Sequence, residues 1–150
     1  METPQLNSLY QQLILEHYRH PRNKAELDDK SVEIHLANPV CGDEIRLQLR
    51  IEDDRVAEAK FVGQGCSISQ AAVSMMTTLI EGRSLDEAGD LAKRFTEMMH
   101  GDESAAKDKA LGDLRALQGV SKFPVRIKCA LLGFDALQQA LQQSAGGEGS

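Results

Sequence analysis

Hydrophobic residues recur with a period of two in one part of this chain, which lies between segments with a helical period. Apolar and polar side chains alternate over residues 31–36 and over residues 45–51, and a third strand is predicted around Val56–Val62. Alternation of this kind predicts half-buried strands. The connections between the three runs are short, and Asp53-Asp54 supplies a turn between the last two, so the pattern favours an antiparallel meander.

Helical spacing is found before and after these strands. Residues 8–20 predict an amphipathic helix with Ser8 as a candidate N-cap, and Pro21 ends it. Further helices are predicted over residues 69–80, from Ser84 towards His100, and from Pro124 onwards, with a short segment at 111–117. Residues 101–110 are polar and predict a solvated connection or a weak helix. Strands followed by helices indicate an α+β domain, with helices packed on one face of a three-stranded antiparallel sheet.

Length and composition are those of one globular domain. The chain has 150 residues, of which 41% are hydrophobic and 27% charged, so we expect a single domain over residues 1–143 and a disordered tail over residues 144–150. The net charge of −6 and the absence of Trp argue against nucleic-acid binding. No apolar run approaches the ~18 residues of a membrane helix, and no signal-peptide pattern is present, so a cytoplasmic protein without a membrane partner is expected.

Three cysteines point most directly to chemistry. Cys41, Cys66 and Cys129 each lie at the boundary of a predicted element, beside Gly or Pro. An odd number excludes a complete intrachain disulfide framework, and separated thiols at such boundaries predict metal ligands or nucleophiles. A helix N-terminus also favours the thiolate form. The alternative for each cysteine is the role of a small buried hydrophobic side chain.

Three thiolates need a fourth donor to complete a tetrahedral zinc site. Asp43 is the first candidate, because residues two apart in an extended segment point to the same side, and Cys41 and Asp43 have that spacing. Arg126 and Lys128 are placed to offset the negative charge of such a site. The histidines are the alternative candidates for the fourth ligand, although none of them is adjacent to a cysteine. They are His17, His20, His35 and His100.

Taken together, the motifs resemble a known family. The segments LYQQLILEHYRHPRN, NPVCGDEIRL, GQGCSISQAAVSMM and LQGVSKFPVRIKCALLGFDAL are similar, in this order, to the U-type iron–sulfur cluster assembly proteins. This resemblance implies the α+β fold shared by SufE and IscU. Lys128 stands where the IscU branch has a histidine, and 62 residues separate Cys66 from Cys129. The segment GDESAAKDKALGDL, around residues 101–114, is similar to the insertion of the SufU branch, so the resemblance favours that branch.

The resemblance also implies a site and a reaction. It gives Cys41, Asp43, Cys66 and Cys129 as zinc ligands and Cys41 as the acceptor of sulfur. The implied function is that of a zinc-dependent sulfurtransferase, which takes persulfide sulfur from a SufS-type cysteine desulfurase and stimulates its turnover. Pyridoxal phosphate would belong to that partner alone. Arg126 is expected to steer the anionic persulfide or the acidic surface of the partner.

Two other functions stay open on the sequence. The same cysteines suit a scaffold that assembles a transient Fe–S cluster and passes it to apo-proteins or other assembly proteins, because thiolates bind zinc and clusters alike. Lys128 in the place of a histidine argues against that function. The third possibility is a binding module with structural zinc and inert cysteines.

Overall fold

Three antiparallel strands form the sheet that the alternating pattern predicts. They are β1 (Val32–Asn38), β2 (Asp43–Glu52) and β3 (Arg55–Gln64), paired in the order β1-β2-β3. Asp53 and Asp54 connect β2 to β3, and both have positive φ angles, of 52° and 59°. Two left-handed residues in a two-residue hairpin loop give the turn twist that matches the twist of the strands. The predicted meander is confirmed.

The computed structural model describes residues 4–40 and 42–149. Cys41, the predicted acceptor of sulfur, lies outside the described residues. Within the described part of the chain, no helix is long and apolar enough to span a membrane.

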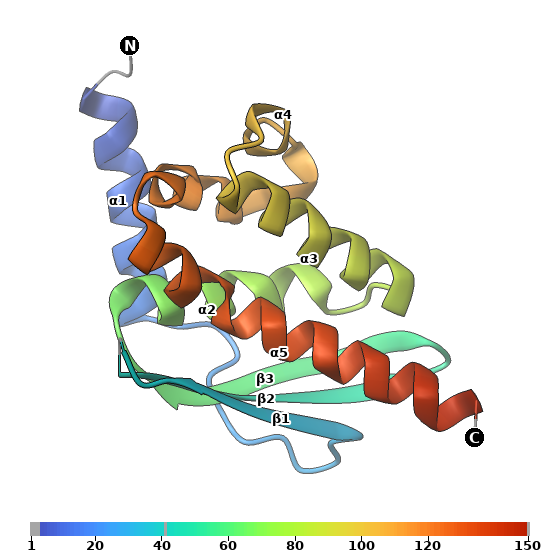
Figure 1. Cartoon of the computed structure of the whole chain (residues 1–150). Helices are drawn as coiled ribbons and strands as arrows, with labels where there is room; N and C mark the ends of the chain where they lie inside the picture. The colour runs from blue at the N-terminus through green and yellow to red at the C-terminus, as the bar shows by residue number, and fades with distance from the viewer. Residues whose placement is uncertain (1–3, 41, 150) are drawn as a thin grey trace.

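Helices pack in layers above one face of the sheet (Figure 1). Next to the sheet lie α2 (Ser67–Ile80) and α5 (Pro124–Gly149), and α1 (Pro4–Arg19) packs against α2 at one end of the molecule. The outer layer contains α3 (Leu85–Met99), the short α4 (Glu103–Ala106) and the 3₁₀ segment η1 (Lys109–Lys122). This arrangement confirms the predicted α+β class with helices on one face.

One hydrophobic core joins the sheet to both helical layers. Ile45, Leu47 and Leu49 alternate along β2 and are fully buried, as the period of two requires. In the helical layers, the rings of Phe95 and Phe134 stack with centroids 4.2 Å apart. Each such side chain contributes about 1.5–3 kcal/mol through burial. This core holds the ends of β2, α2 and α5 in fixed relative positions.

Some element boundaries differ from those predicted. The first helix begins at Pro4 rather than Ser8, because proline is well suited to a first helical turn. The segment predicted at 111–117 extends from Lys109 to Lys122, with a break at Gly112, where φ is 50°. Ser84 caps α3 in a capping box, as predicted. Helix α5 extends to Gly149, and the division into a domain of residues 1–143 and a disordered tail stays a prediction.

Candidate metal centre

Asp43 is held at the start of β2 with its carboxylate pointing inward. The residue is 1% exposed. Its Oδ1 accepts a hydrogen bond of 2.8 Å from the backbone N–H of Cys66. A buried carboxylate needs such a partner because burial without one is costly. The bond also ties the beginning of β2 to the beginning of α2.

Cys66 is the N-cap of α2, where the chain leaves β3 for the helix. Its Sγ accepts a hydrogen bond of 3.5 Å from the backbone N–H of Ser69, and the Ser69 hydroxyl donates to the Cys66 carbonyl oxygen at 3.1 Å. These two bonds fix the position of the Cys66 side chain at the beginning of α2. Sequence reasoning did not identify Ser69, although a serine three residues after a capping residue was a usable signal.

Cys129 completes the group from the second turn of α5. Its side chain is fully buried. The ligand atoms of Asp43, Cys66 and Cys129 all lie within 4.8 Å of one another. The three residues come from three elements that are far apart in the sequence, so the fold itself assembles the group.

The group has the donor chemistry and spacing that zinc requires. Bonds of about 2.3 Å to sulfur and 2.0–2.2 Å to oxygen place the ligand atoms of tetrahedral zinc roughly 3.5–3.8 Å apart. The Cys66 Sγ and the Asp43 Oδ2 atoms are separated by 3.8 Å. Two thiols and one carboxylate therefore fit as three of four ligands. The predicted fourth ligand, Cys41, lies outside the described residues, so its role as a ligand stays a prediction.

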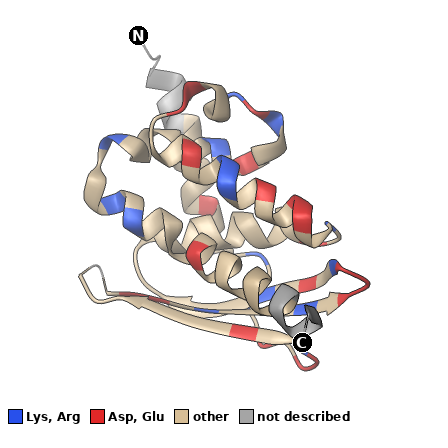
Figure 2. Ribbon diagram, turned by 45° about the vertical axis from the view of Figure 1, so that its right-hand side comes forward, with Lys and Arg blue, Asp and Glu red and all other residues tan. Residues whose placement is uncertain are grey.

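Arg126 lies one helical turn before Cys129, at the edge of this group. The pKa of Arg126 is raised above its ordinary value. The main cause is the negative charge of Cys66, and the second is a hydrogen bond to Cys129. The guanidinium is exposed to solvent. Figure 2 shows basic residues on the first turns of α5, whereas α3 carries mainly acidic ones. The structure therefore places the predicted cation beside the thiols, and its steering role stays a prediction.

Gly65 makes the approach of Asp43 and Cys66 possible. Its φ is +150°, and a Cβ atom at this position would lie 2.3 Å from the Asp43 Oδ1. No side chain fits there without moving the carboxylate. This role of Gly65 was not predicted from the sequence. A glycine directly before a candidate ligand was the available signal.

The competing histidines lie elsewhere in the described part of the chain. His17 is 2% exposed, with Nδ1 2.8 Å from the Ser74 hydroxyl and Nε2 3.0 Å from Asp113. His35 is exposed and pairs with Glu44. Among the side chains that the structure describes, no histidine joins Asp43, Cys66 and Cys129.

The sequence and the fold agree on one family. Residues 9–130 match the family described as the NifU-like N-terminal domain. The chain belongs to this family. It is a SufU-type iron–sulfur cluster assembly protein, since it is 49% identical over 142 residues to the zinc-dependent sulfurtransferase SufU of Bacillus subtilis, covering 95% of both chains.

Other members of the family carry scaffold names or show the same fold. The iron–sulfur cluster assembly scaffold protein IscU of Streptococcus pyogenes is 41% identical, over 97% of this chain and 90% of that protein. The solved structure of SufU from Fervidobacterium islandicum is 30% identical, with a TM-score of 0.80 over 90% of this chain and 98% of that one. A NifU-like N-terminal domain from Brucella abortus, 21% identical, shares the fold with a TM-score of 0.82, over 94% of this chain and 97% of that one.

Proposed function

We propose that this SufU-type protein is a zinc-dependent sulfurtransferase. In this proposal it accepts persulfide sulfur on Cys41 from a SufS-type cysteine desulfurase in the cytoplasm and stimulates turnover of that enzyme. The observation that carries the proposal is the convergence of Asp43, Cys66 and Cys129, whose ligand atoms lie within 4.8 Å of one another. The similarity to the zinc-dependent sulfurtransferase of B. subtilis supports it.

The transfer step is a thiol–persulfide exchange. The Cys41 thiolate attacks the outer sulfur of the donor persulfide, and a new S–S bond forms on Cys41 as the S–S bond of the donor breaks. The donor cysteine leaves as a thiolate, so no external oxidant or reductant is consumed. Pyridoxal phosphate stays with the desulfurase, which generates the persulfide.

The residues of the centre have separate tasks in this step. Asp43, Cys66 and Cys129 hold the metal, and Arg126 attracts the anionic persulfide to the edge of the group. Zinc, when bound, keeps its thiol ligands deprotonated and protects them from oxidation. The hydrogen bond from the Cys66 backbone to Asp43 fixes the orientation of the carboxylate.

A scaffold function is the second candidate. The 41% identity to a protein named as an IscU scaffold favours it, and thiolates suit Fe–S clusters as well as zinc. In that case the protein would assemble a cluster and pass it to apo-proteins. Lys128 in the place of the histidine of the IscU branch argues for sulfur transfer instead.

Metal and acid-labile sulfide per chain, measured on protein isolated without air, separate the two candidates. We expect stoichiometric zinc, no sulfide and a colourless protein. Iron with sulfide and a visible charge-transfer band would support the scaffold function and overturn zinc as the working metal.

The role of Cys41 is tested with the desulfurase itself. We expect Cys41→Ala to abolish stimulation of desulfurase turnover, because the variant lacks the attacking thiolate. Undiminished stimulation would refute the proposal. Alkylation of Cys41 in the complex with the desulfurase tests the third possibility, since a structural zinc module would keep this thiol unreactive.

A further inference from the structure

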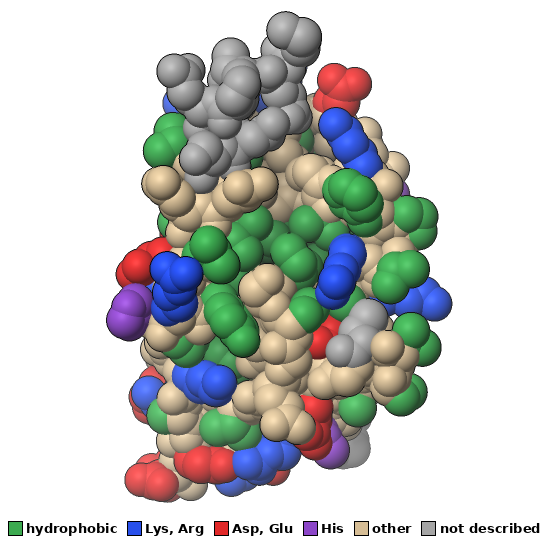
Figure 3. All heavy atoms as spheres, turned by 90° about the vertical axis from the view of Figure 1, so that its left-hand side faces the viewer, with side chains coloured by type: hydrophobic (Ala, Val, Ile, Leu, Met, Phe, Trp, Pro, Cys, Tyr) green, Lys and Arg blue, Asp and Glu red, His purple; other side chains and the backbone are tan. Residues whose placement is uncertain are grey.

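An apolar pocket opens directly beside the metal centre. It has a volume of about 500 Å³ and lies between α1, the start of α2 and η1, with Cys66 and Arg126 at its edge. Figure 3 shows this face, where apolar side chains gather over the centre of the view. The apolar side chains that line the pocket are Tyr10, Ile14, Ile68, Ala116, Val120 and Phe123.

Three large apolar side chains in or beside the lining segments are exposed to solvent. Phe123, which lines the pocket, is 61% exposed, and so are Leu9 on α1 and Val125 at the start of α5, each of which precedes a lining residue in the sequence. Clustered exposed side chains of this size are unfavourable in water and mark binding surfaces more often than scattered ones do. Because Cys66 lies at the pocket edge, an occupant of the pocket stands next to the thiols of the centre.

The pocket edge carries a cation although the chain as a whole is acidic. Arg126 lines the pocket, and Lys122 and Lys128 are close to it in the sequence, in a chain whose net charge is −6. An anionic group approaching this surface is therefore attracted locally, although the molecule as a whole is acidic. An apolar pocket with a cationic edge suits a partner segment that joins an apolar side chain to a negative group.

We infer that the pocket binds an apolar side chain of the donor protein, next to the cysteine that carries the persulfide. This inference rests on the proposed function. The apolar side chain fills the pocket between α1 and η1, and the negatively charged persulfide lies at the edge formed by Arg126 and Cys66. Binding of the donor and transfer of sulfur thus depend on different parts of the surface. The pocket sets the affinity for the donor, and the centre receives the sulfur.

The chain between the second and third cysteines contributes one wall of this pocket. Ala116, Val120 and Phe123 come from η1 and the residue that follows it. The preceding insertion holds η1 in place, since Asp108 both caps η1 and pairs with Arg94 on α3. The insertion therefore acts on donor recognition indirectly, by positioning this wall.

Gly119→Leu tests the inference by filling the pocket from within. Gly119 lines the pocket, and a Cβ atom there meets no other atom within 4 Å, so the larger side chain enters open space. We expect the variant concentration that gives half-maximal stimulation of the desulfurase to rise about tenfold, which corresponds to about 1.4 kcal/mol of binding free energy. Maximal stimulation, zinc content and the circular dichroism spectrum should match those of the wild type.

Gly89→Leu is the matched control, since it adds the same side chain to a helical glycine on α3, where a Cβ atom contacts only Leu141 at 3.7 Å. Phe123→Ser is the second variant, because it removes apolar surface from the pocket edge at an exposed position.

Half-maximal concentrations within twofold of wild type for both Gly119→Leu and Phe123→Ser would overturn the inference. Loss of stimulation in Cys41→Ala alongside that result would leave the proposed function standing, whereas a wild type without stimulation would overturn both.

Discussion

Gly65 occupies the turn between β3 and α2, where the backbone passes closest to Asp43. A Cβ atom there would lie 2.3 Å from the Asp43 Oδ1 and 2.9 Å from both the Asp43 Cα and the Ser69 Oγ. The neighbouring atoms belong to the ligand group and its support, so they have little freedom to move. The geometry of the centre thus depends on the absence of a side chain at this position.

We therefore expect Gly65→Ala to lower the affinity for zinc at least tenfold, because the methyl group displaces the Asp43 carboxylate. A competition titration with a chromophoric chelator measures the effect. Gly82→Ala is the control, since Gly82 also has a positive φ, of +82°, but a Cβ atom there meets nothing within 4 Å. Equal zinc affinities for the two variants would show that contact with Asp43 is unimportant.

Asp43→Asn separates the charge of the carboxylate from its hydrogen bond. The amide oxygen can still accept from the Cys66 backbone N–H, so the local structure should persist. We expect zinc affinity to fall more than tenfold, because a neutral amide is a poorer ligand than a carboxylate. Unchanged affinity in the same titration would exclude Asp43 from the ligand set.

At the scale of elements, His17 joins α1 to the rest of the helical layers. Its ring bonds to Ser74 on α2 and to Asp113 on η1, and the Ser74 hydroxyl also accepts the backbone N–H of Arg22 at 2.8 Å. Ser74 is fully buried. One side chain thus connects α1, α2 and η1, and all three of these elements line the apolar pocket.

His17→Ala should lower the free energy of unfolding by about 2–4 kcal/mol, since it leaves a cavity and removes a partner of the buried Ser74 hydroxyl. Urea unfolding followed by circular dichroism measures the change. His35→Ala is the control, because the pair of His35 and Glu44 lies on the surface and should contribute less than about 0.5 kcal/mol. Similar losses for the two variants would contradict the connecting role of His17.

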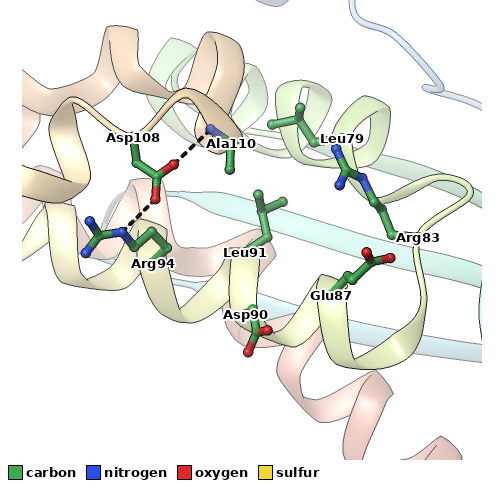
Figure 4. A pocket seen from close by; sticks show the side chains of 8 residues that line it. All are labelled: Leu79, Arg83, Glu87, Asp90, Leu91, Arg94, Asp108 and Ala110. Atoms are coloured by element: carbon green, nitrogen blue, oxygen red, sulfur yellow. Dashed lines mark hydrogen bonds and ion pairs between the residues drawn. The ribbon is translucent and has the colours of Figure 1, made fainter.

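Arg94 and Asp108 join α3 to the start of η1 at a groove of about 260 Å³ (Figure 4). Two hydrogen bonds hold the pKa of Asp108 below its ordinary value of 3.8. The one from the Arg94 side chain has the larger effect, and the one from the backbone N–H of Ala110 has the smaller. A carboxyl whose pKa is lowered in the folded state stabilises the fold above the unfolded-state pKa. That contribution disappears as the pH falls through the lowered value.

We expect Asp108→Asn to lower the thermal midpoint slightly at neutral pH, because the pair is partly exposed to solvent. The difference from wild type should shrink as the pH falls below 3.8. Thermal unfolding of both proteins across this range provides the test. A difference that persists or grows at acid pH would assign the effect to packing rather than to the ion pair.

The sequence was informative wherever a local pattern decides the structure. Alternation in β2 and the capping box at Ser84 depend on nearby residues, and both were predicted correctly. The extent of η1 was not, because its 3₁₀ conformation depends on packing against α2 and α3. Asp43 was identified from its spacing to Cys41, whereas the role of Gly65 depends on a contact between segments about twenty residues apart, which spacing does not reveal.

At the scale of the whole molecule, the centre lies at one end of a core that does not include it. The buried apolar cluster extends over the sheet and the helices, so secondary structure should survive loss of the metal. A ligand that binds only the folded state adds about 2.7 kcal/mol when present at one hundred times its dissociation constant. Bound zinc should therefore raise the free energy of unfolding, whereas the apolar core should be sufficient to maintain the fold.

Removal of zinc with a chelator should lower the thermal midpoint by roughly 5–10 °C for a domain of this size. The circular dichroism spectrum at 20 °C should stay unchanged. The shift should become smaller at acid pH, since protons compete with the metal for the thiols. A chelated protein that is unfolded at 20 °C would show that the core alone does not support the fold.

The order of the three assembled residues along the chain sets the timing of their assembly during synthesis. Asp43 and Cys66 emerge from the ribosome early, but Cys129 follows only after α2, α3, α4 and η1 have been made. A nascent chain therefore presents an incomplete donor set until α5 has emerged and packed against α2. We therefore expect the full set of Asp43, Cys66 and Cys129 to become available to a metal only in chains whose synthesis has passed α5.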